Sequence, residues 1–236
     1  EELNKKKKEL TSKVLIKDSS RGITNDFEID IKEIKLINEI GSGTFGKVYR
    51  AKWRKTFVAV KYMKPEYTNN EKLMKEFLEE CVFMKNLRHP NILMFMGAGT
   101  KGTDNFIILE MCDNNNLFYI LHRCKEINLD WEWKRRVALE ICYGMHYLHS
   151  FNPPIVHRDL KSMNVLLTKN WTVKVADFGN TKFLDTHMSK SKGTFQWMAP
   201  EVISYTNYTQ MADVFSFGII MHEIYSRTPP YSGVDK

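Results

Sequence analysis

An octapeptide in the second half of the chain carries a dense run of polar and charged side chains. Residues 157–164 read His-Arg-Asp-Leu-Lys-Ser-Met-Asn. Apolar runs lie on both sides, at 155–156 and 165–167. Because buried charges need partners, a charged loop on a solvated surface is the less favoured interpretation of polar residues between two apolar strands. We therefore interpret this stretch as a chemical site.

Two short apolar runs after the octapeptide predict a β-hairpin. Residues 165–168 and 172–176 have strand-like composition, with a short loop between them. Asn164 stands before the first run and Asp177 after the second, so an antiparallel hairpin brings their side-chain oxygens together at its open end. Such oxygens suit Mg²⁺, which completes its octahedron with phosphate and water. With Asp159 nearby to accept a proton, the sequence predicts a site for phosphoryl transfer.

These motifs resemble those of protein kinases. The octapeptide is similar to the catalytic loop of that family, Asp-Phe-Gly at 177–179 to its metal-binding turn, and Met-Ala-Pro-Glu at 198–201 to the motif that closes the segment between. The octapeptide together with Gly-Thr-Phe-Gln-Trp-Met at 193–198 resembles the tyrosine-kinase-like group, which includes the Raf and mixed-lineage kinases. Members of that group mostly phosphorylate Ser and Thr.

A glycine-rich stretch upstream lies between two strand-like runs. Its pattern G-x-G-x-x-G at 41–46 could open a dinucleotide-binding unit, but that requires a helix directly after the glycines. Residues 48–53 instead alternate like a strand, which is the kinase arrangement for covering phosphates with backbone N–H groups. By the resemblance Leu109 is the gatekeeper residue. The ATP-binding residues implied in this way are Ile40, Gly41, Ser42, Gly43, Thr44, Phe45, Gly46, Val48, Ala59, Lys61, Leu109, Glu110, Cys112 and Leu166.

Lys61 ends an apolar strand at 57–60, so its ammonium should lie in a cleft and needs a counter-charge. A helix expected over about 70–87 offers one. Glu80 shares the inward face of this helix, whereas Glu79 should point to solvent. The resemblance implies that Lys61, held by Glu80, contacts the α and β phosphates. The apolar stripe that defines the inward face is Leu73, Phe77, Cys81 and Met84.

The resemblance also assigns the remaining catalytic roles. Asn164 and Asp177 should hold Mg²⁺. Asp159 should orient the substrate hydroxyl and accept its proton, and Lys161 should face the γ-phosphate. A Lys at this position, with Thr194 able to bond Asp159 and Lys161, is the pattern of serine/threonine kinases.

Arg158 points to regulation, because it has no obvious local acid and in related kinases is usually satisfied by a phosphate on the segment 177–201. Ser189 and Ser191 are the predicted phosphorylation sites, with Thr186 behind them. Asn180 departs from the family pattern, which commonly has Leu after Asp-Phe-Gly. That departure leaves the metal ligands intact and puts the packing of inactive conformations in question.

Other elements must hold these residues in place. Residues 27–30 and 34–37 alternate like strands, and 106–109 form a buried-looking strand before the hinge. Asp130 should cap a long helix that supports the catalytic loop. Asp213 lies in a very apolar helix and must be paired; in the family it holds the backbone at 157–158.

The resemblance implies an α+β, two-lobed protein kinase fold, with a small β-rich N-lobe containing one main helix and a mostly helical C-lobe. We expect a basic polar extension or juxtamembrane linker over 1–26, the N-lobe and hinge over 27–112, and the C-lobe over 113–236. Related kinases continue through several more helices after the one around Asp213. The C-lobe is therefore expected to be truncated after its central helix.

The composition is that of an ordinary globular protein, with 43% hydrophobic and 27% charged residues. The net charge of +7 is uneven, since residues 1–21 hold seven Lys or Arg against four Asp or Glu. This basic run, or a missing upstream segment, could lie beside anionic lipid; a solvated linker is the alternative. No nucleic-acid motif accompanies the charge, and we assign no nucleic-acid partner.

The four cysteines lack metal-ligand spacing, so we expect free thiols in a reducing, intracellular setting. No run in the sequence is long and apolar enough to span a membrane. The chain begins with Glu1 rather than Met, which predicts that it is part of a longer protein. We expect that protein in the cytoplasm or on the cytoplasmic side of a membrane, and pairing of two kinase domains is a further expectation.

The resemblance implies a serine/threonine kinase that uses ATP and Mg²⁺ and acts on protein substrates in intracellular signalling. The alternative is a pseudokinase, a binding or scaffold module that keeps the fold without turnover. Pseudokinases usually lose at least one key residue, and this chain could also be inactive without the missing helices. The key residues present here, which favour the active kinase, are Lys61, Glu80, Asp159, Asn164 and Asp177.

Overall fold

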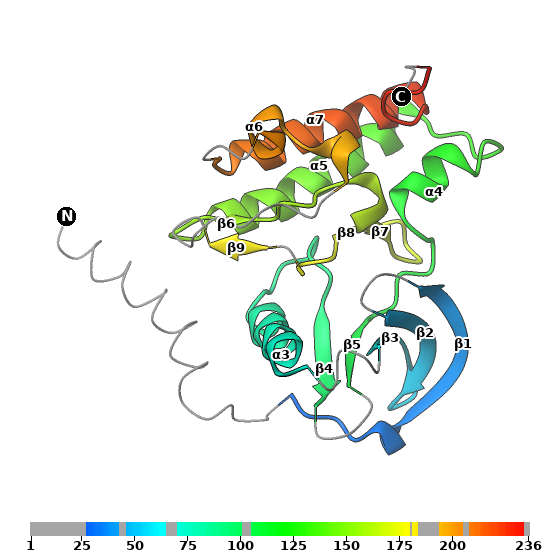
Figure 1. The fold of residues 1–236 in the computed structure, drawn as a ribbon. Coiled ribbons are helices and arrows are strands. Elements are labelled where there is room, and N and C mark those ends of the chain that lie inside the picture. Colours follow the sequence, from blue (N-terminus) through cyan, green and yellow to red (C-terminus); the bar gives the residue numbers. More distant parts are fainter. Residues whose placement is uncertain are drawn as a thin grey trace. The chain divides into compact units, whose positions relative to one another are not determined.

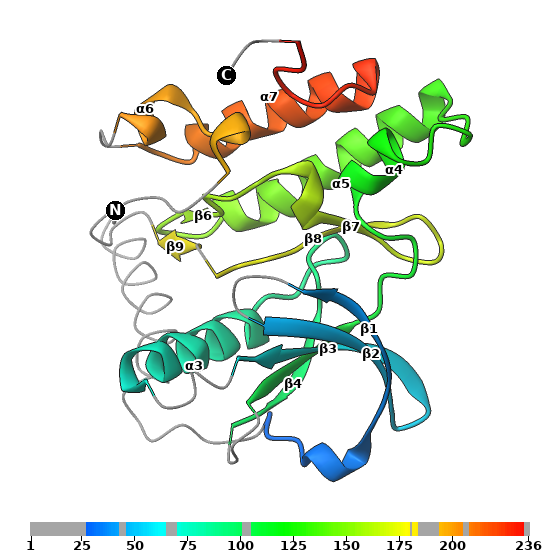
Figure 2. The same ribbon diagram turned by 45° about the vertical axis from the view of Figure 1, so that its right-hand side comes forward.

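The structure is a computed structural model, and Figures 1 and 2 show it from two directions. It describes residues 27–42, 46–64, 70–100, 105–179, 181–183, 194–204 and 208–233. The predictions for 1–26, Gly43, Thr44, Phe45, Asn180, Thr186, Ser189 and Ser191 lie outside the described residues. The chain divides into two compact units, the first with Glu1–Arg88 and Leu93–Met111, the second with His89–Ile92 and Cys112–Lys236.

The first unit is built on an antiparallel sheet of five strands in the order β1-β2-β3-β5-β4. The two-residue turn between β2 and β3 has φ values of 44° at Arg54 and 69° at Lys55. Positive φ at both positions gives the twist that suits the flanking strands. The strands are β1 (Ile34–Ser42), β2 (Gly46–Trp53), β3 (Thr56–Met63), β4 (Phe95–Gly99) and β5 (Phe106–Glu110).

The prediction of a strand over 27–30 is wrong. Only Glu28 pairs, in an isolated bridge with Ala98, and a 3₁₀ helix follows at Ile31–Glu33. The side chain of Asp30 caps this helix by accepting a hydrogen bond of 2.9 Å from the N–H of Lys32. A short acidic side chain thus offers the backbone a local partner that competes with the ladder of a strand. The strand predicted at 34–37 forms and is longer than expected.

The register of the sheet sorts its side chains onto two faces. Val48 lies opposite Lys61, and Ala59 lies opposite Leu109, so these four share one face. Their neighbours in the strands point the other way into a buried core of Ala51, Val58, Val60, Phe106 and Ile108. Alternation along β3 therefore separates the side chains available to a ligand from those that hold the sheet together.

Helix α3 (Glu71–Lys85) packs beside β4 and confirms the helix predicted from periodicity. Asn70 caps it, because its side-chain oxygen accepts from the N–H groups of Lys72 and Leu73. Phe77, Cys81 and Met84 are buried, which is the predicted inward stripe apart from the half-buried Leu73.

The second unit is mainly helical, with α5 and α7 running side by side (Figures 1 and 2). Asp130 caps α5, as predicted, by accepting from the N–H of Trp133 at 2.7 Å. The pairing of β6 with β9 was not predicted from the sequence. The helices are α4 (Leu117–His122), α5 (Trp131–His149), η2 (Ser162–Asn164), η3 (Phe195–Trp197), α6 (Pro200–Ile203) and α7 (Met211–Ser226), and the strands are β6 (Ile155–Val156), β7 (Val165–Leu167), β8 (Val173–Val175) and β9 (Lys182–Phe183).

All four cysteines are free thiols. Within the described part of the chain, no helix is both long and apolar enough to cross a bilayer.

Candidate active site

The first unit holds the predicted pair of Lys61 and Glu80. Lys61 lies inside β3, which continues to Met63 instead of ending at residue 60 as predicted, and its Nζ lies 3.8 Å from Oε1 of Glu80 on α3. Both side chains are about a quarter exposed or less, at 24% and 20%. Glu79 is 57% exposed and meets Lys75 at 4.0 Å, one turn away on the same helix. The helical phase of α3 therefore places Glu80, and not Glu79, beside Lys61, as the apolar stripe of this helix predicted.

The described residues of the glycine-rich stretch flank this pair. A Cβ at Gly46 would overlap the backbone carbonyl of Tyr62, so the close approach of β2 to β3 there requires glycine. Gly41 has open space around it. Of the ATP-binding residues predicted at the sheet, Val48, Ala59, Lys61 and Leu109 share one face, while Ile40, Gly41 and Ser42 are exposed near the end of β1.

At the end of β5, Glu110 is tied twice to the chain entering β4. Its N–H donates to the carbonyl of Met94 at 3.1 Å, and its Oε1 accepts from the N–H of Met94 at 2.7 Å. That N–H is thus not available to an adenine ring. Cys112 and Leu166, also predicted to contact ATP, are half-buried residues of the second unit, Leu166 in the middle of β7.

The second unit brings the predicted catalytic residues together. Lys161 Nζ donates to both carboxylate oxygens of Asp159, at 3.1 and 2.8 Å, and to the hydroxyl of Thr194 at 2.9 Å. The side chain of Asp159 is only 7% exposed and that of Lys161 15%. Lys161 thus links the carboxylate to the start of η3, as the pattern of serine/threonine kinases predicted. In the described part of the chain, Thr194 does not bond Asp159 directly. Lys161 lies between the two and bonds both.

The predicted hairpin forms from β7 and β8, with Val165 opposite Val175. The N–H of Ala176 donates to the carbonyl of Asn164 at 2.8 Å, so Asn164 and Asp177 both stand at the open end. The amide nitrogen of Asn164 donates to the carbonyl of Asp159 at 2.8 Å and to its Oδ2 at 3.2 Å. Its Oδ1 is therefore the atom available to a cation.

The side-chain oxygens of Asn164 and Asp177 suit Mg²⁺ better than they suit a metal that is bound by protein ligands alone. Magnesium is typically held by one or two protein oxygens together with phosphate and water, and Asn164 and Asp177 supply two. Among the described residues, no group of three or more His, Cys, Asp or Glu side chains gathers as a metal site. Asp177 has φ of 69°, an unusual conformation for a non-glycine residue that is held where a site is expected.

A buried carboxylate fixes the backbone of the catalytic loop. Asp213 on α7 is 1% exposed and accepts from the N–H of His157 at 2.9 Å and of Arg158 at 3.0 Å. The Nε2 of His149 lies 2.8 Å from the same carboxylate. The partner that the sequence required for Asp213 is therefore the loop itself, together with one histidine of α5.

His157 is a core residue, as predicted. Its ring is fully buried and meets Phe178 edge to face at 5.5 Å between centroids. Nε2 lies 3.1 Å from the carbonyl of Ala176, and Nδ1 accepts from the N–H of Asp159 at 3.3 Å. With both ring nitrogens used to hold backbone, His157 orients the loop and is not a base.

Arg158 lies with its guanidinium 5.6 Å from the ring centroid of Tyr208. Burial raises the pKa of the Tyr208 hydroxyl, so this side chain stays neutral beside the arginine. The predicted partner of Arg158 is a phosphate on Ser189, Ser191 or Thr186. These three residues lie outside the described residues.

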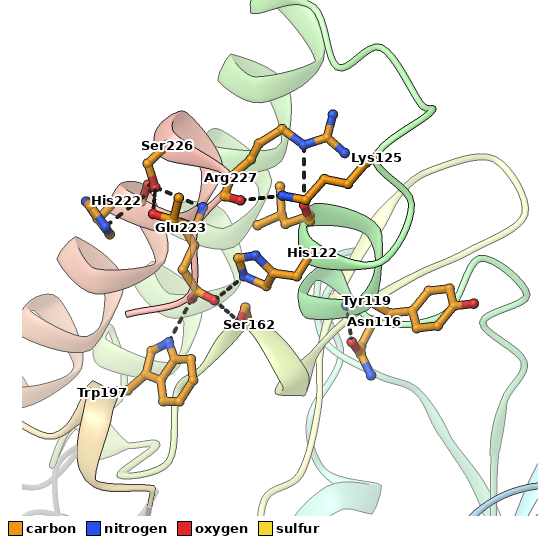
Figure 3. A network of polar contacts seen from close by, with 12 residues as sticks. Asn116, Tyr119, His122, Lys125, Ser162, Trp197, His222, Glu223, Ser226 and Arg227 are labelled. Atoms are coloured by element: carbon orange, nitrogen blue, oxygen red, sulfur yellow. Dashed lines mark hydrogen bonds and ion pairs between the residues drawn. The ribbon is translucent and has the colours of Figure 1, made fainter. Parts of the chain in front are cut away.

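Sequence analysis missed one buried residue, Glu223 on α7, which receives hydrogen bonds from three separate elements (Figure 3). The signal was present, because Glu223 stands in the same apolar helix as Asp213 and must be paired for the same reason.

Comparison with known proteins gives a consistent result. The family described as "Protein tyrosine and serine/threonine kinase" matches residues 34–236. The chain is 42% identical over 208 residues to "Probable serine/threonine-protein kinase drkB" of Dictyostelium discoideum, covering 88% of this chain and 30% of that protein. It is 43% identical over 210 residues to "Probable serine/threonine-protein kinase SIS8" of Arabidopsis thaliana, covering 88% of this chain and 20% of that protein. The chain thus spans less than a third of the length of these relatives.

Proposed function

Because the chain belongs to the protein tyrosine and serine/threonine kinase family, we propose that it transfers the γ-phosphate of ATP to Ser or Thr hydroxyls of protein substrates. The observation that carries this proposal is the contact of Lys161 with both Asp159 and Thr194. This contact places the ammonium of Lys161, which can neutralise the transferred phosphate, beside the proton acceptor Asp159 and beside Thr194 at the start of η3. The names of the relatives support the choice of Ser and Thr.

The residues of the second unit would act mainly by position and charge. Asp159, fixed by Lys161 and by the amide of Asn164, accepts the proton of the substrate hydroxyl. Lys161 neutralises charge on the phosphoryl group as it moves. Asn164 and Asp177 would hold Mg²⁺, which when bound offsets charge on the phosphates.

In the first unit, Lys61 would contact the α and β phosphates. Glu80 holds its ammonium within 3.8 Å, which orients a flexible side chain before the nucleotide arrives. The face shared by Val48, Ala59 and Leu109 would accept the adenine ring, since it is lined by apolar side chains opposite the core face.

Finer assignments belong to the same proposal. The octapeptide and the residues before Ala-Pro-Glu support a place in the tyrosine-kinase-like group. Free cysteines support a location in the cytoplasm or on the cytoplasmic side of a membrane. Phosphorylation at Ser189, Ser191 or Thr186, proximity to a membrane and pairing of kinase domains stay predictions.

The test is a phosphotransfer assay with radiolabelled ATP and a mixed protein substrate, followed by phosphoamino-acid analysis. We expect phosphoserine and phosphothreonine from the wild type and none from Asp159→Asn. Phosphotyrosine alone would contradict the proposed specificity. Tight binding of Mg-ATP without any transfer would contradict the proposed turnover and favour the pseudokinase.

A further inference from the structure

Glu223 is a fully buried carboxylate near the C-terminal end of α7, and it accepts three hydrogen bonds (Figure 3). Ser162 Oγ donates to Oε1 at 2.7 Å, and His122 Nε2 lies 2.9 Å from the same oxygen. Trp197 Nε1 donates to Oε2 at 2.8 Å. The donors come from η2, α4 and η3, three elements that are far apart in the chain. A buried carboxylate needs such donors, because an unpaired charge in the interior is strongly destabilising.

The hydrogen on His122 can be placed from this geometry. An ionised carboxylate only accepts, so Nε2 must carry a hydrogen. Nδ1 is buried and has no hydrogen-bond partner among the described residues. His122 acts as a donor to Glu223 and leaves the carboxylate free to receive the other two.

Two of these donors stand beside the candidate chemistry. Ser162 directly follows Lys161 and begins η2, which ends at Asn164. Trp197 ends η3, which directly follows Thr194. The bond of 2.9 Å from Lys161 to Thr194 joins these two segments at the site. Glu223 joins the same two segments a second time, through buried side chains.

We propose that Glu223 is a positioning residue for phosphoryl transfer, resting on the function proposed above. It bridges η2 and η3 through Ser162 and Trp197, which keeps Lys161 bonded to both Asp159 and Thr194. Glu223 itself touches none of these three residues through a hydrogen bond. Its effect on turnover therefore depends on having a donor from each side.

Two side-chain substitutions can cut this bridge without removing either segment. Ser162→Ala removes one donor, and Trp197→Phe removes the other while keeping an aromatic ring. The backbone of Trp197 stays attached to α7, because the hydroxyl of Ser216 donates to its carbonyl at 2.7 Å. Ile141→Val is the control, since Ile141 is fully buried in α5 and lies outside the network.

Each single change should lower kcat about threefold to tenfold, the range of one lost hydrogen bond, with KM for ATP unchanged. The double variant should lose little more than the larger single, because cutting either side already breaks the bridge. Ile141→Val should lower the melting temperature and keep kcat. Unchanged kcat in both singles, or losses that multiply in the double variant, would overturn the proposal.

Hydrogen exchange provides a measurement that does not depend on activity. The N–H of Asn164 is bonded to Lys161 at 2.9 Å and that of Trp197 to Thr194 at 3.1 Å. Ser162→Ala should speed exchange in η3, and Trp197→Phe should speed it in η2, while Ile141→Val does neither. Faster exchange only in the substituted segment would mean that Glu223 does not couple η2 to η3.

The two measurements separate the proposals. An inactive wild type would defeat the proposed function, and the exchange data would still decide whether Glu223 couples η2 and η3. An active wild type with equally active variants would defeat the bridge alone. Glu223→Gln keeps the shape of the side chain but only one acceptor oxygen, so it should lower kcat at least as much as Ser162→Ala or Trp197→Phe. If Glu223→Gln fails to fold, those two single variants still test the proposal.

Discussion

The chemistry of this protein is concentrated in a few side chains whose neighbours leave each of them little freedom. Asp159 accepts hydrogen bonds from Lys161 and from the amide of Asn164, and Lys61 forms an ion pair with Glu80. Charged groups held in this way are oriented before any ligand arrives, which lowers the cost of reaching the reactive arrangement. Single substitutions should therefore separate their roles.

Asp159 and Asp177 should fail at different steps. Asp159→Asn should retain Mg-ATP binding and lose turnover by about a hundredfold or more, as expected for a positioned base. Asp177→Asn should also weaken Mg-ATP binding, because it keeps one oxygen but removes the negative charge offered to the cation. Calorimetric titration with Mg-ATP, beside the transfer assay, distinguishes them. Equal nucleotide affinity and equal activity in both variants would contradict the assignment.

Glu80 and Glu79 form a matched pair on adjacent positions of α3. Glu80→Gln should lower kcat/KM about tenfold, because the ammonium of Lys61 loses its counter-charge. Glu79→Gln should change it less than about twofold, since an exposed pair contributes little. Steady-state kinetics at saturating peptide provides the comparison. The opposite ranking would mean that the helix turns differently in the working enzyme.

At the scale of elements, the C-terminal end of α4 is bound by a side chain from beyond the end of α7. Arg227 has φ of 54° and directs its guanidinium at the carbonyls around the end of α4. It donates to Cys124 at 2.7 Å and Ile127 at 2.8 Å, with longer bonds to Ile120 and Leu121. The terminal carbonyls of a helix lack intrahelical partners, so this arginine closes α4.

Arg227→Met should therefore destabilise the fold by about 2–4 kcal/mol, since several bonds to a charged donor are lost from a partly buried site. Arg135→Met is the control. Its partner is Glu132, both side chains are more than half exposed, and its loss should cost less than about 1 kcal/mol. Urea unfolding of both variants measures the difference. Similar midpoints would show that the capping contacts contribute nothing.

At the scale of the whole molecule, stability should depend on pH through a buried thiol. Cys81 lies on the inward face of α3 with no exposed surface, and burial raises the pKa of its thiol far above the usual range. The folded protein therefore keeps this proton where the unfolded chain releases it. Stability is full below pH 9 and falls as the pH rises further, because the unfolded state then binds fewer protons.

The contribution of Cys81 should approach about 1.4 kcal/mol per pH unit above pH 9. Cys81→Ala should be less stable at neutral pH, because it leaves a cavity, but should lose stability more slowly between pH 9 and 10.5. Urea unfolding over that range gives both slopes, and parallel slopes would contradict the prediction. In the folded wild type, Cys81 should also resist alkylation that labels the half-buried Cys112 and Cys124.

The sequence by itself determined what local spacing can encode. The hairpin of β7 and β8, the inward phase of α3 and the cap at Asp130 all depend on residues within a few positions of one another. The magnesium ligands that we propose, Asn164 and Asp177, were predicted from the two ends of one hairpin. The same local rule failed at 27–30, where the side chain of Asp30 favoured a 3₁₀ turn over a strand.

The tertiary structure alone decided the contacts between residues far apart in the chain. Glu223 receives donors 26, 61 and 101 positions away, and Arg227 caps a helix about 100 positions earlier. Sequence could show that a carboxylate in an apolar helix needs partners, because burying a charge without them is costly. It could not show which partners, because that depends on how whole elements pack, and periodicity within one element carries no information about its neighbours.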